Sequence, residues 1–291
     1  MLSPEFLKRL ERVSIVARKS LKGVGQGERR GKRAGGSVEF SDYRRYSPGD
    51  DTRRVDWYAY ARLEQMFLKL FVEEQDLAVH LLVDLSASME AGSPSKRVQA
   101  LQVAAALGYV ALSAGDRVSP WFLRQDRAER PLPSLRGRHS LARLLKALNE
   151  SGPGAGGTTL AASVQAFLAR RPARGVVVLI SDLLDPSGVQ GPIERLRYAG
   201  FELHVLHVIA PEEREPAIGA EVDLLDLETQ ETVAVSLDQR AIRAYRAAFE
   251  AFLSETEALC LRHGVSYVPA SSSDPLDELV LGALRQSSLV R

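Results

Sequence analysis

Short apolar runs alternate with segments of helical periodicity from residue 77 onward. The run Val176–Ile180 is apolar throughout, which is typical of a central strand buried on both faces of a sheet. This alternation predicts βαβ units, and therefore an α/β fold with a mostly parallel sheet covered by helices on both faces. The expected strands are 77–83, 117–123, 176–180, 202–209 and 265–269, and the expected helices are 96–114, 140–149, 159–170, 193–199, 239–263 and 276–286.

The first quarter of the chain has a different character. Residues 5–20 carry apolar side chains at helical spacing, which predicts a short amphipathic helix. Residues 22–37 are rich in Gly, Arg and Lys without periodicity, which predicts a loop, and residues 48–51 form a strong turn sequence. Their apolar content is too low for a separate core. We therefore predict a basic and aromatic arm over residues 1–75, packed on a main domain over residues 76–291.

The strand–helix alternation is interrupted between residues 211 and 237. Residues 222–227 and 232–236 alternate in polarity around a polar turn, which predicts a β-hairpin inserted at about residues 220–237. The two tryptophans, Trp57 and Trp121, are expected in the core.

The composition points to a reducing compartment. Lys and Arg number 38 against 37 Asp and Glu, although the basic residues are enriched before residue 62. The single cysteine, Cys260, excludes a disulfide within the chain. We find no apolar signal-peptide core and no run of eighteen apolar residues, so the chain is expected to be soluble and cytoplasmic, with no membrane contact.

Oxygen-bearing side chains occur at three places, two at the ends of expected strands and one after a Gly-rich loop. Asp84, Ser86 and Ser88 come at the end of one apolar run, Thr158 opens a helix after a Gly-rich loop, and Asp182 directly follows another apolar run. Strand ends of an open α/β sheet meet at one edge, where ligands bind. Carboxylate and hydroxyl oxygens suit Mg²⁺ or Mn²⁺. Each loop could instead only cap the following helix or turn.

Two groups of residues carry a family resemblance. Asp84-x-Ser86-x-Ser88, Gly157-Thr158 and Ser181-Asp182 resemble the metal-ion-dependent adhesion site of von Willebrand factor A (vWA) domains. Residues 37–62, with the sequence SVEFSDYRRYSPGDDTRRVDWYAYAR, are similar to the signature of the bacterial domain-of-unknown-function 58 family.

The resemblance implies a vWA-like Rossmann fold with a metal at its upper edge. It implies that Ser86, Ser88 and Thr158 bind the metal directly and that Asp84 and Asp182 bind it through water. It also implies partnership with a MoxR-type AAA+ ATPase and a co-chaperone or assembly role. Adhesion domains often have Gly after the last Asp, whereas this chain has Leu183.

Such a site recognises a partner protein and turns over no substrate. A divalent cation with an open position accepts a carboxylate from an Asp or Glu of the partner, and such charge-assisted contacts are strong. We therefore expect no enzymatic activity. Arg44, Arg45, Arg53 and Arg54 are candidate partner-binding residues in the arm.

Two alternatives stay open. The basic arm could bind nucleic acid, although Arg residues that pair with Asp50, Asp51 and Asp56 would explain the same charges. A haloacid-dehalogenase-type phosphatase would use Asp84 as nucleophile and Asp182 with Asp185 for Mg²⁺. The phosphatase pattern is less favoured because it requires an acid where Ser86 stands.

Overall fold

The computed structural model describes residues 3–17, 38–73, 76–154, 159–216, 221–225, 232–236, 239–287 and 289–291. The chain divides into two compact units, a large one of residues 1–22 with 77–291 and a small one of residues 23–76. The predicted arm is thus divided, since its first residues belong to the large unit. That the remainder of the arm packs on the main domain stays a prediction, and the expected loop at 22–37 lies outside the described residues.

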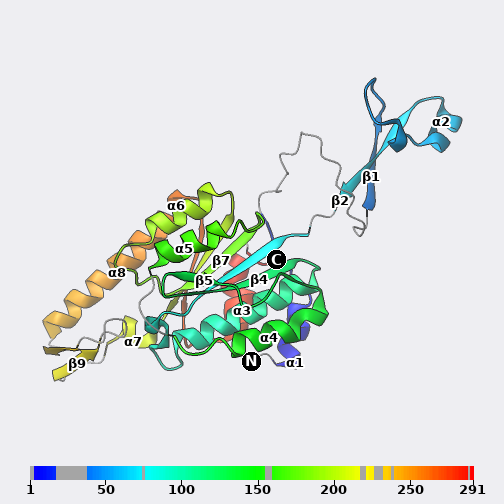
Figure 1. The fold of residues 1–291 in the computed structure, drawn as a ribbon. Coiled ribbons are helices and arrows are strands. Elements are labelled where there is room, and N and C mark those ends of the chain that lie inside the picture. Colours follow the sequence, from blue (N-terminus) through cyan, green and yellow to red (C-terminus); the bar gives the residue numbers. More distant parts are fainter. Residues whose placement is uncertain are drawn as a thin grey trace. The chain divides into compact units, whose positions relative to one another are not determined.

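The described part of the large unit contains a seven-stranded sheet with the order β11-β8-β7-β3-β4-β5, in which β6 also pairs with β4 (Figure 1). The first five of these strands run parallel, and β5 and β6 are antiparallel to β4. The predicted α/β class with a mostly parallel sheet is confirmed. The strands are β3 (Ala78–Asp84), β4 (Arg117–Arg124), β5 (Arg127–Glu129), β6 (Leu135–Arg136), β7 (Val176–Ser181), β8 (Glu202–Ile209) and β11 (Ser266–Ser271).

Helices cover both faces of this sheet because successive strand residues point to opposite sides. On β3, Leu81 and Val83 belong to one buried cluster and Leu82 to the other. The first face is covered by α1 (Pro4–Leu10), α3 (Lys96–Ser113), α4 (Leu141–Asn149) and the C-terminal turns α9 (Leu276–Glu278), η4 (Leu279–Ala283) and α10 (Leu284–Gln286). The second face is covered by α5 (Leu160–Ala169), α6 (Gln190–Tyr198) and α8 (Gln239–Arg262).

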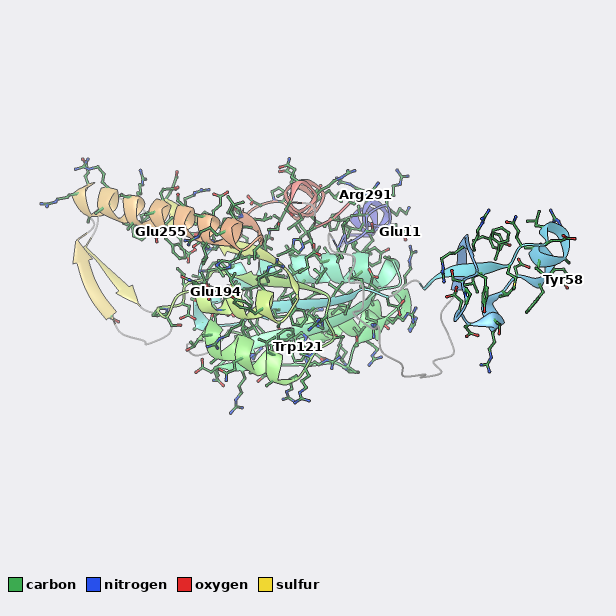
Figure 2. The ribbon with its side chains drawn as sticks, turned by 90° about the horizontal axis from the view of Figure 1, so that it is seen from above. Glu11, Tyr58, Trp121, Glu194, Glu255 and Arg291 are labelled. Carbon is green, nitrogen blue, oxygen red and sulfur yellow. The ribbon has the colours of Figure 1, made fainter. Side chains whose placement is uncertain are left out.

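The N-terminal segment differs from the expected helix at 5–20. Helix α1 ends at Leu10, and Ile15 forms an isolated antiparallel bridge with Val290. The Ser14 amide donates to the Arg291 carbonyl over 3.0 Å, and the Arg291 amide donates back over 2.9 Å. Figure 2 shows the same proximity between the labelled Glu11 and Arg291. The expected helix is therefore wrong from residue 11 to 17. The β-branched residues of this segment favour an extended backbone, which pairs with residues 289–291.

Two hairpins complete the described structure. In the large unit, β9 (Glu221–Leu225) pairs with β10 (Thr232–Ser236), at the position predicted for the inserted hairpin. In the small unit, β1 (Val38–Arg45) pairs with β2 (Phe67–Glu73), and η1 (Thr52–Arg54) and α2 (Trp57–Leu63) lie between them in sequence.

The two tryptophans have opposite surroundings. Trp121 is 2% exposed, as expected of a core residue, whereas Trp57 is 57% exposed. The expectation for Trp57 is wrong because Trp57 begins α2, a helix in which no described side chain is buried. No helix in the described part of the chain is long and apolar enough to cross a membrane.

Candidate metal centre

Asp84 joins the ends of β3 and β7. It is the last residue of β3, and its Oδ1 atom accepts a 2.9 Å hydrogen bond from the Ser86 amide. Its Oδ2 atom accepts a 2.6 Å hydrogen bond from the hydroxyl of Ser181, the last residue of β7. The Asp84 carboxylate is buried, and both of its oxygens are held. A carboxylate fixed in this way can orient water molecules around an ion rather than move to bind it.

The hydroxyls of Ser86 and Ser88 are candidate groups for direct binding of a metal ion. Their Oγ atoms lie 3.0 Å apart. Adjacent ligands of an octahedral Mg²⁺, each about 2.0–2.1 Å from the ion, are about 3.0 Å apart. The spacing of the two hydroxyls therefore fits two neighbouring positions of an octahedral ion.

Asp182 comes directly after β7 and is already paired with a cation. Its Oδ2 atom lies 2.7 Å from Nζ of Lys96, and its Oδ1 atom accepts from the Leu184 amide over 3.2 Å. The Lys96 ammonium also pairs with Glu213, in α7 (Pro211–Arg214), and is fully buried. Sequence reasoning placed Lys96 only at the start of a helix. A positive charge at a helix N-terminus is unfavourable because of the helix dipole. A lysine at this position could therefore have indicated that an acidic side chain lies nearby.

The surroundings of Asp84 disfavour the ionised form of its carboxyl group. Burial, followed by repulsion from Asp182, raises the pKa of Asp84 to about 6 against hydrogen bonds that lower it. His207 adds no compensating charge, because burial lowers its pKa to about 4. Its Nδ1 atom lies 2.7 Å from the hydroxyl of Tyr267. A divalent cation near Asp84 and Asp182 would relieve this repulsion, so the donor set fits such an ion.

Leu183 occupies the position where the adhesion motif often has Gly. Its φ is +56°, in the left-handed region that favours Gly. The Leu183 amide donates to Ser181 Oγ over 2.9 Å, and its side chain is 1% exposed. The turn therefore keeps the left-handed conformation with a Leu, whose burial and hydrogen bond offset the backbone strain.

Three loops carry the candidate ligands: the first follows β3, the second lies between α4 and α5, and the third follows β7. The second loop is described only at its two ends, since Thr158 lies outside the described residues. At one end, the Gly154 amide donates to Glu90 over 2.6 Å, and a Cβ on Gly154 would overlap the carbonyl of Ser86. At the other end, the Leu160 amide donates to Asp185 over 2.6 Å. The described ends of this loop thus contact the first and third loops respectively.

Any metal site here depends on hydroxyl oxygens. Within the described ranges, no group of three or more His, Cys, Asp and Glu side chains could hold a metal ion. The structure brings together Asp84, Ser86, Ser88 and Asp182, and we call these four residues the oxygen cluster. Asp185, the other acid of the phosphatase alternative, instead accepts hydrogen bonds from Leu160 and Ser187.

The arginines predicted to bind a partner lie in the small unit. Arg44 pairs with Asp50 over 2.7 Å. This ion pair agrees with the explanation that the arginines of the arm pair with nearby Asp residues. Arg45 and Arg53 are exposed, and the side chain of Arg54 lies outside what the structure describes. A partner-binding role for the four arginines stays a prediction.

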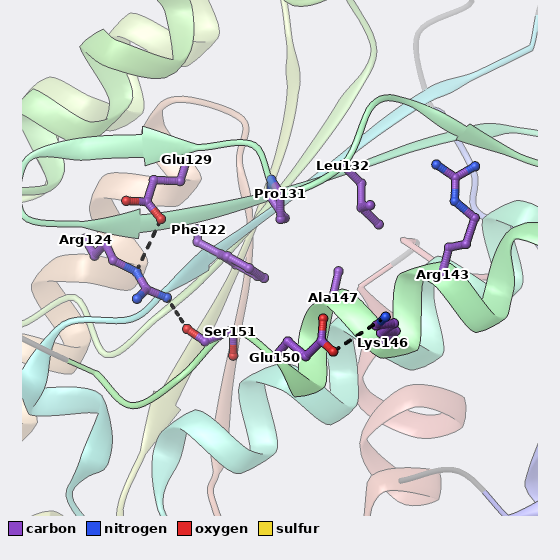
Figure 3. A pocket seen from close by; sticks show the side chains of 10 residues that line it. All are labelled: Phe122, Arg124, Glu129, Pro131, Leu132, Arg143, Lys146, Ala147, Glu150 and Ser151. Carbon is purple, nitrogen blue, oxygen red and sulfur yellow. Dashed lines mark hydrogen bonds and ion pairs between the residues drawn. The ribbon is translucent and has the colours of Figure 1, made fainter.

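A cavity with a volume of about 660 Å³ lies between β4 and α4 (Figure 3). None of the four oxygen-cluster residues lines it. Arg124 crosses one side of it, where its Nη2 atom donates to the Ser151 carbonyl over 2.6 Å. Arg124 therefore anchors the start of the second loop, and the cavity is not the candidate metal site.

The family model described as "Protein of unknown function DUF58" matches residues 42–257. This span exceeds half of the chain. The chain belongs to the DUF58 family. An uncharacterized protein of Mycobacterium tuberculosis is 29% identical to this DUF58 protein over 257 residues, which cover 84% of this chain and 80% of the relative.

Two solved structures resemble the fold of this DUF58 protein. The conserved hypothetical protein BatB from Bacteroides thetaiotaomicron is 18% identical, with a TM-score of 0.43, over 73% of this chain and 98% of BatB. The SpRpn10 VWA domain is 13% identical, with a TM-score of 0.39, over 71% of this chain and 94% of that domain. Because both TM-scores are below 0.5, no site residue or activity is carried over from either structure.

Proposed function

We propose that this DUF58 protein is a metal-dependent protein-binding module of the vWA type. Ser86, Ser88 and Thr158 bind Mg²⁺ or Mn²⁺ directly, and Asp84 and Asp182 act through bound water. The observation that supports this most strongly is the 3.0 Å separation of the Ser86 and Ser88 hydroxyls beside two buried carboxylates. A hard cation fits such an all-oxygen donor set.

Held by these residues, a divalent ion would supply the positive charge to which a carboxylate from an Asp or Glu of a partner protein binds. The chain's own residues set up this step. Asp84 and Asp182 are held by hydrogen bonds and by Lys96, so they keep their orientation when the partner arrives. A partner without an acid at this point would leave the cation unpaired, and that requirement gives the site its specificity.

The partner that the family resemblance suggests is a MoxR-type AAA+ ATPase. This protein would then act in the cytoplasm as a co-chaperone or assembly factor, without catalysis of its own. The exposed Arg45 and Arg53 of the small unit supply positive charge for a second contact with an acidic surface.

Binding of the MoxR-type ATPase from the same organism to the immobilised protein tests this function. At constant Mg²⁺, we expect Ser86→Ala/Ser88→Ala to lose retention of the ATPase. The matched control is Ser271→Ala/Ser273→Ala, a second Ser-x-Ser pair whose Oγ atoms lie 2.8 Å apart in an exposed turn. Equal retention by all three proteins would contradict the proposal.

A further inference from the structure

A second, smaller cavity lies at the opposite ends of the strands from the oxygen cluster. It has a volume of about 190 Å³. Its lining includes Ala78 at the start of β3, Arg117 at the start of β4 and Ala173 shortly before β7. These strands are parallel, and β3 is seven residues long. At about 3.3 Å per residue, roughly 20 Å separate Ala78, in the lining, from Asp84 at the other end of the strand.

Four arginines line this cavity, Arg117, Arg130, Arg170 and Arg171, and no acidic side chain belongs to its described lining. His80 also lines it, and burial lowers the pKa of His80, as do the charges of Arg130 and Arg117. The positive charge of the cavity therefore comes from guanidinium groups. The dipole of α5 favours cations at its C-terminal end, beside Arg170 and Arg171. It does not account for Arg117 and Arg130, which come from other elements.

The floor of the cavity positions one of these arginines. The guanidinium of Arg130 lies 5.5 Å from the ring centroid of Trp121, a cation–π distance. Arg130 Nη2 donates to Ser119 Oγ over 3.4 Å, and Ser119 Oγ donates to Ser134 Oγ over 3.3 Å. The cavity thus offers hydroxyl groups beside a guanidinium that is held over an aromatic ring.

We propose that this arginine cavity binds a small phosphate-bearing ligand. Guanidinium groups match phosphate oxygens with paired, charge-assisted hydrogen bonds. A cavity of about 190 Å³ has room for one phosphoryl group and a short attached portion. A dianion matches Arg130, Arg170 and Arg171, with no acid among the described lining residues, better than a single carboxylate does. This ligand site is independent of the metal at the oxygen cluster.

Tryptophan fluorescence provides a local reading of this site. The chain has two tryptophans, so Trp57→Phe leaves Trp121 in the cavity as the one reporter. In EDTA, and with ionic strength held constant by NaCl, this protein is titrated with inorganic phosphate, pyrophosphate and glycerol 3-phosphate. We expect a saturable change in Trp121 emission with at least one of these probes. Tighter binding of the ester than of free phosphate would identify a phosphorylated metabolite as the ligand class.

The variant Arg130→Gln/Arg170→Gln should weaken the binding of that probe by at least about tenfold, because it removes two charge-assisted partners. Both arginines are exposed at the rim, so the fold should persist. The control Arg143→Gln/Arg262→Gln removes the same charge from two exposed arginines that do not line the cavity, and it should leave the affinity unchanged.

Three results would overturn the proposal. The first is no saturable response to any probe up to 10 mM. The second is equal weakening in both double variants, which would indicate a diffuse charge effect. The third is a response to duplex DNA alone that is lost in Arg130→Gln/Arg170→Gln, which would make the cavity part of a nucleic-acid surface.

Discussion

The Nζ atom of Lys96 lies 2.7 Å from the Oδ2 atom of Asp182, and both side chains are buried. This ammonium is the cation that the described structure supplies to the oxygen cluster. The same ammonium pairs with Glu213, whose other carboxylate oxygen accepts a 2.8 Å hydrogen bond from the Ala210 amide at the start of α7. Lys96 therefore links the third loop of the candidate site to α7, which precedes the inserted hairpin in the chain.

Lys96→Met should destabilise the metal-free protein by about 3–5 kcal/mol, because Asp182 and Glu213 would lose their shared counter-charge. Loss of the Lys96 positive charge leaves the site more negative, which should also strengthen Mg²⁺ binding. Mg²⁺ should therefore raise the Tm of this variant more than that of the wild type. Urea unfolding and thermal melts with Mg²⁺ or EDTA measure both effects.

The control for Lys96→Met is Lys146→Met, which changes an exposed lysine paired with Glu150 over 3.8 Å. Its free energy of unfolding should stay within about 0.5 kcal/mol of the wild type. A Lys96→Met protein as stable as this control, with an unchanged Mg²⁺ response, would show that the buried pair does not set the charge of the site.

The stability of the metal-free protein should depend on pH through Asp84. Its pKa is about 6 in the folded protein, against an ordinary 3.8. The ionised Asp84 therefore opposes folding above about pH 6, and this cost disappears as the pH falls towards 4. His207, with its pKa lowered to about 4 from 6.5, acts in the opposite sense over an overlapping range, since its buried neutral ring resists protonation.

Comparison with Asp84→Asn separates these two contributions, since this variant keeps His207. In EDTA, the free energy of unfolding of the wild type should rise relative to Asp84→Asn by roughly 2 kcal/mol between pH 7 and pH 4.5. Urea unfolding at each pH measures this difference. A difference that stays constant over the range would mean that the Asp84 pKa is close to its ordinary value.

Gly154→Ala should disturb the first loop, because the added Cβ would overlap the carbonyl of Ser86. We expect a loss of about 1–3 kcal/mol in stability, since neither backbone can give way without moving its loop. Mg²⁺ affinity should also fall. The control Gly191→Ala lies in α6 with no atom near the added Cβ, and it should be neutral or slightly stabilising. Equal stability and equal Mg²⁺ affinity of the two variants would contradict the close approach of Gly154 to the Ser86 carbonyl.

The sequence predicted the large unit well because its strands and helices are long and strongly periodic. The strand expected at 202–209 matches β8, and the hairpin lies where the pattern breaks. Short elements gave no such signal: β5 has three residues and β6 has two. The N-terminal helix was overestimated because apolar spacing cannot show that Ile15 pairs with the distant Val290.

The candidate site was predictable in part. Asp84 and Asp182 directly follow apolar strands, so the parallel sheet brings them to one edge. Lys96 and Glu213 were missed because their pairing joins segments 117 residues apart, which no local pattern reports. Leu183 stands where the adhesion motif often has Gly. Its left-handed backbone conformation could not be predicted from the sequence, because it depends on burial in the folded protein rather than on the preference of Leu.

Calorimetric titration with Mg²⁺ tests the central claim, that the Ser86 and Ser88 hydroxyls bind a divalent ion beside Asp84 and Asp182. The wild type and the Ser271→Ala/Ser273→Ala control should give the same saturable isotherm, and Ser86→Ala/Ser88→Ala should give none. Identical isotherms for the wild type and Ser86→Ala/Ser88→Ala, or no Mg²⁺ binding by the wild type at millimolar concentrations, would contradict the claim.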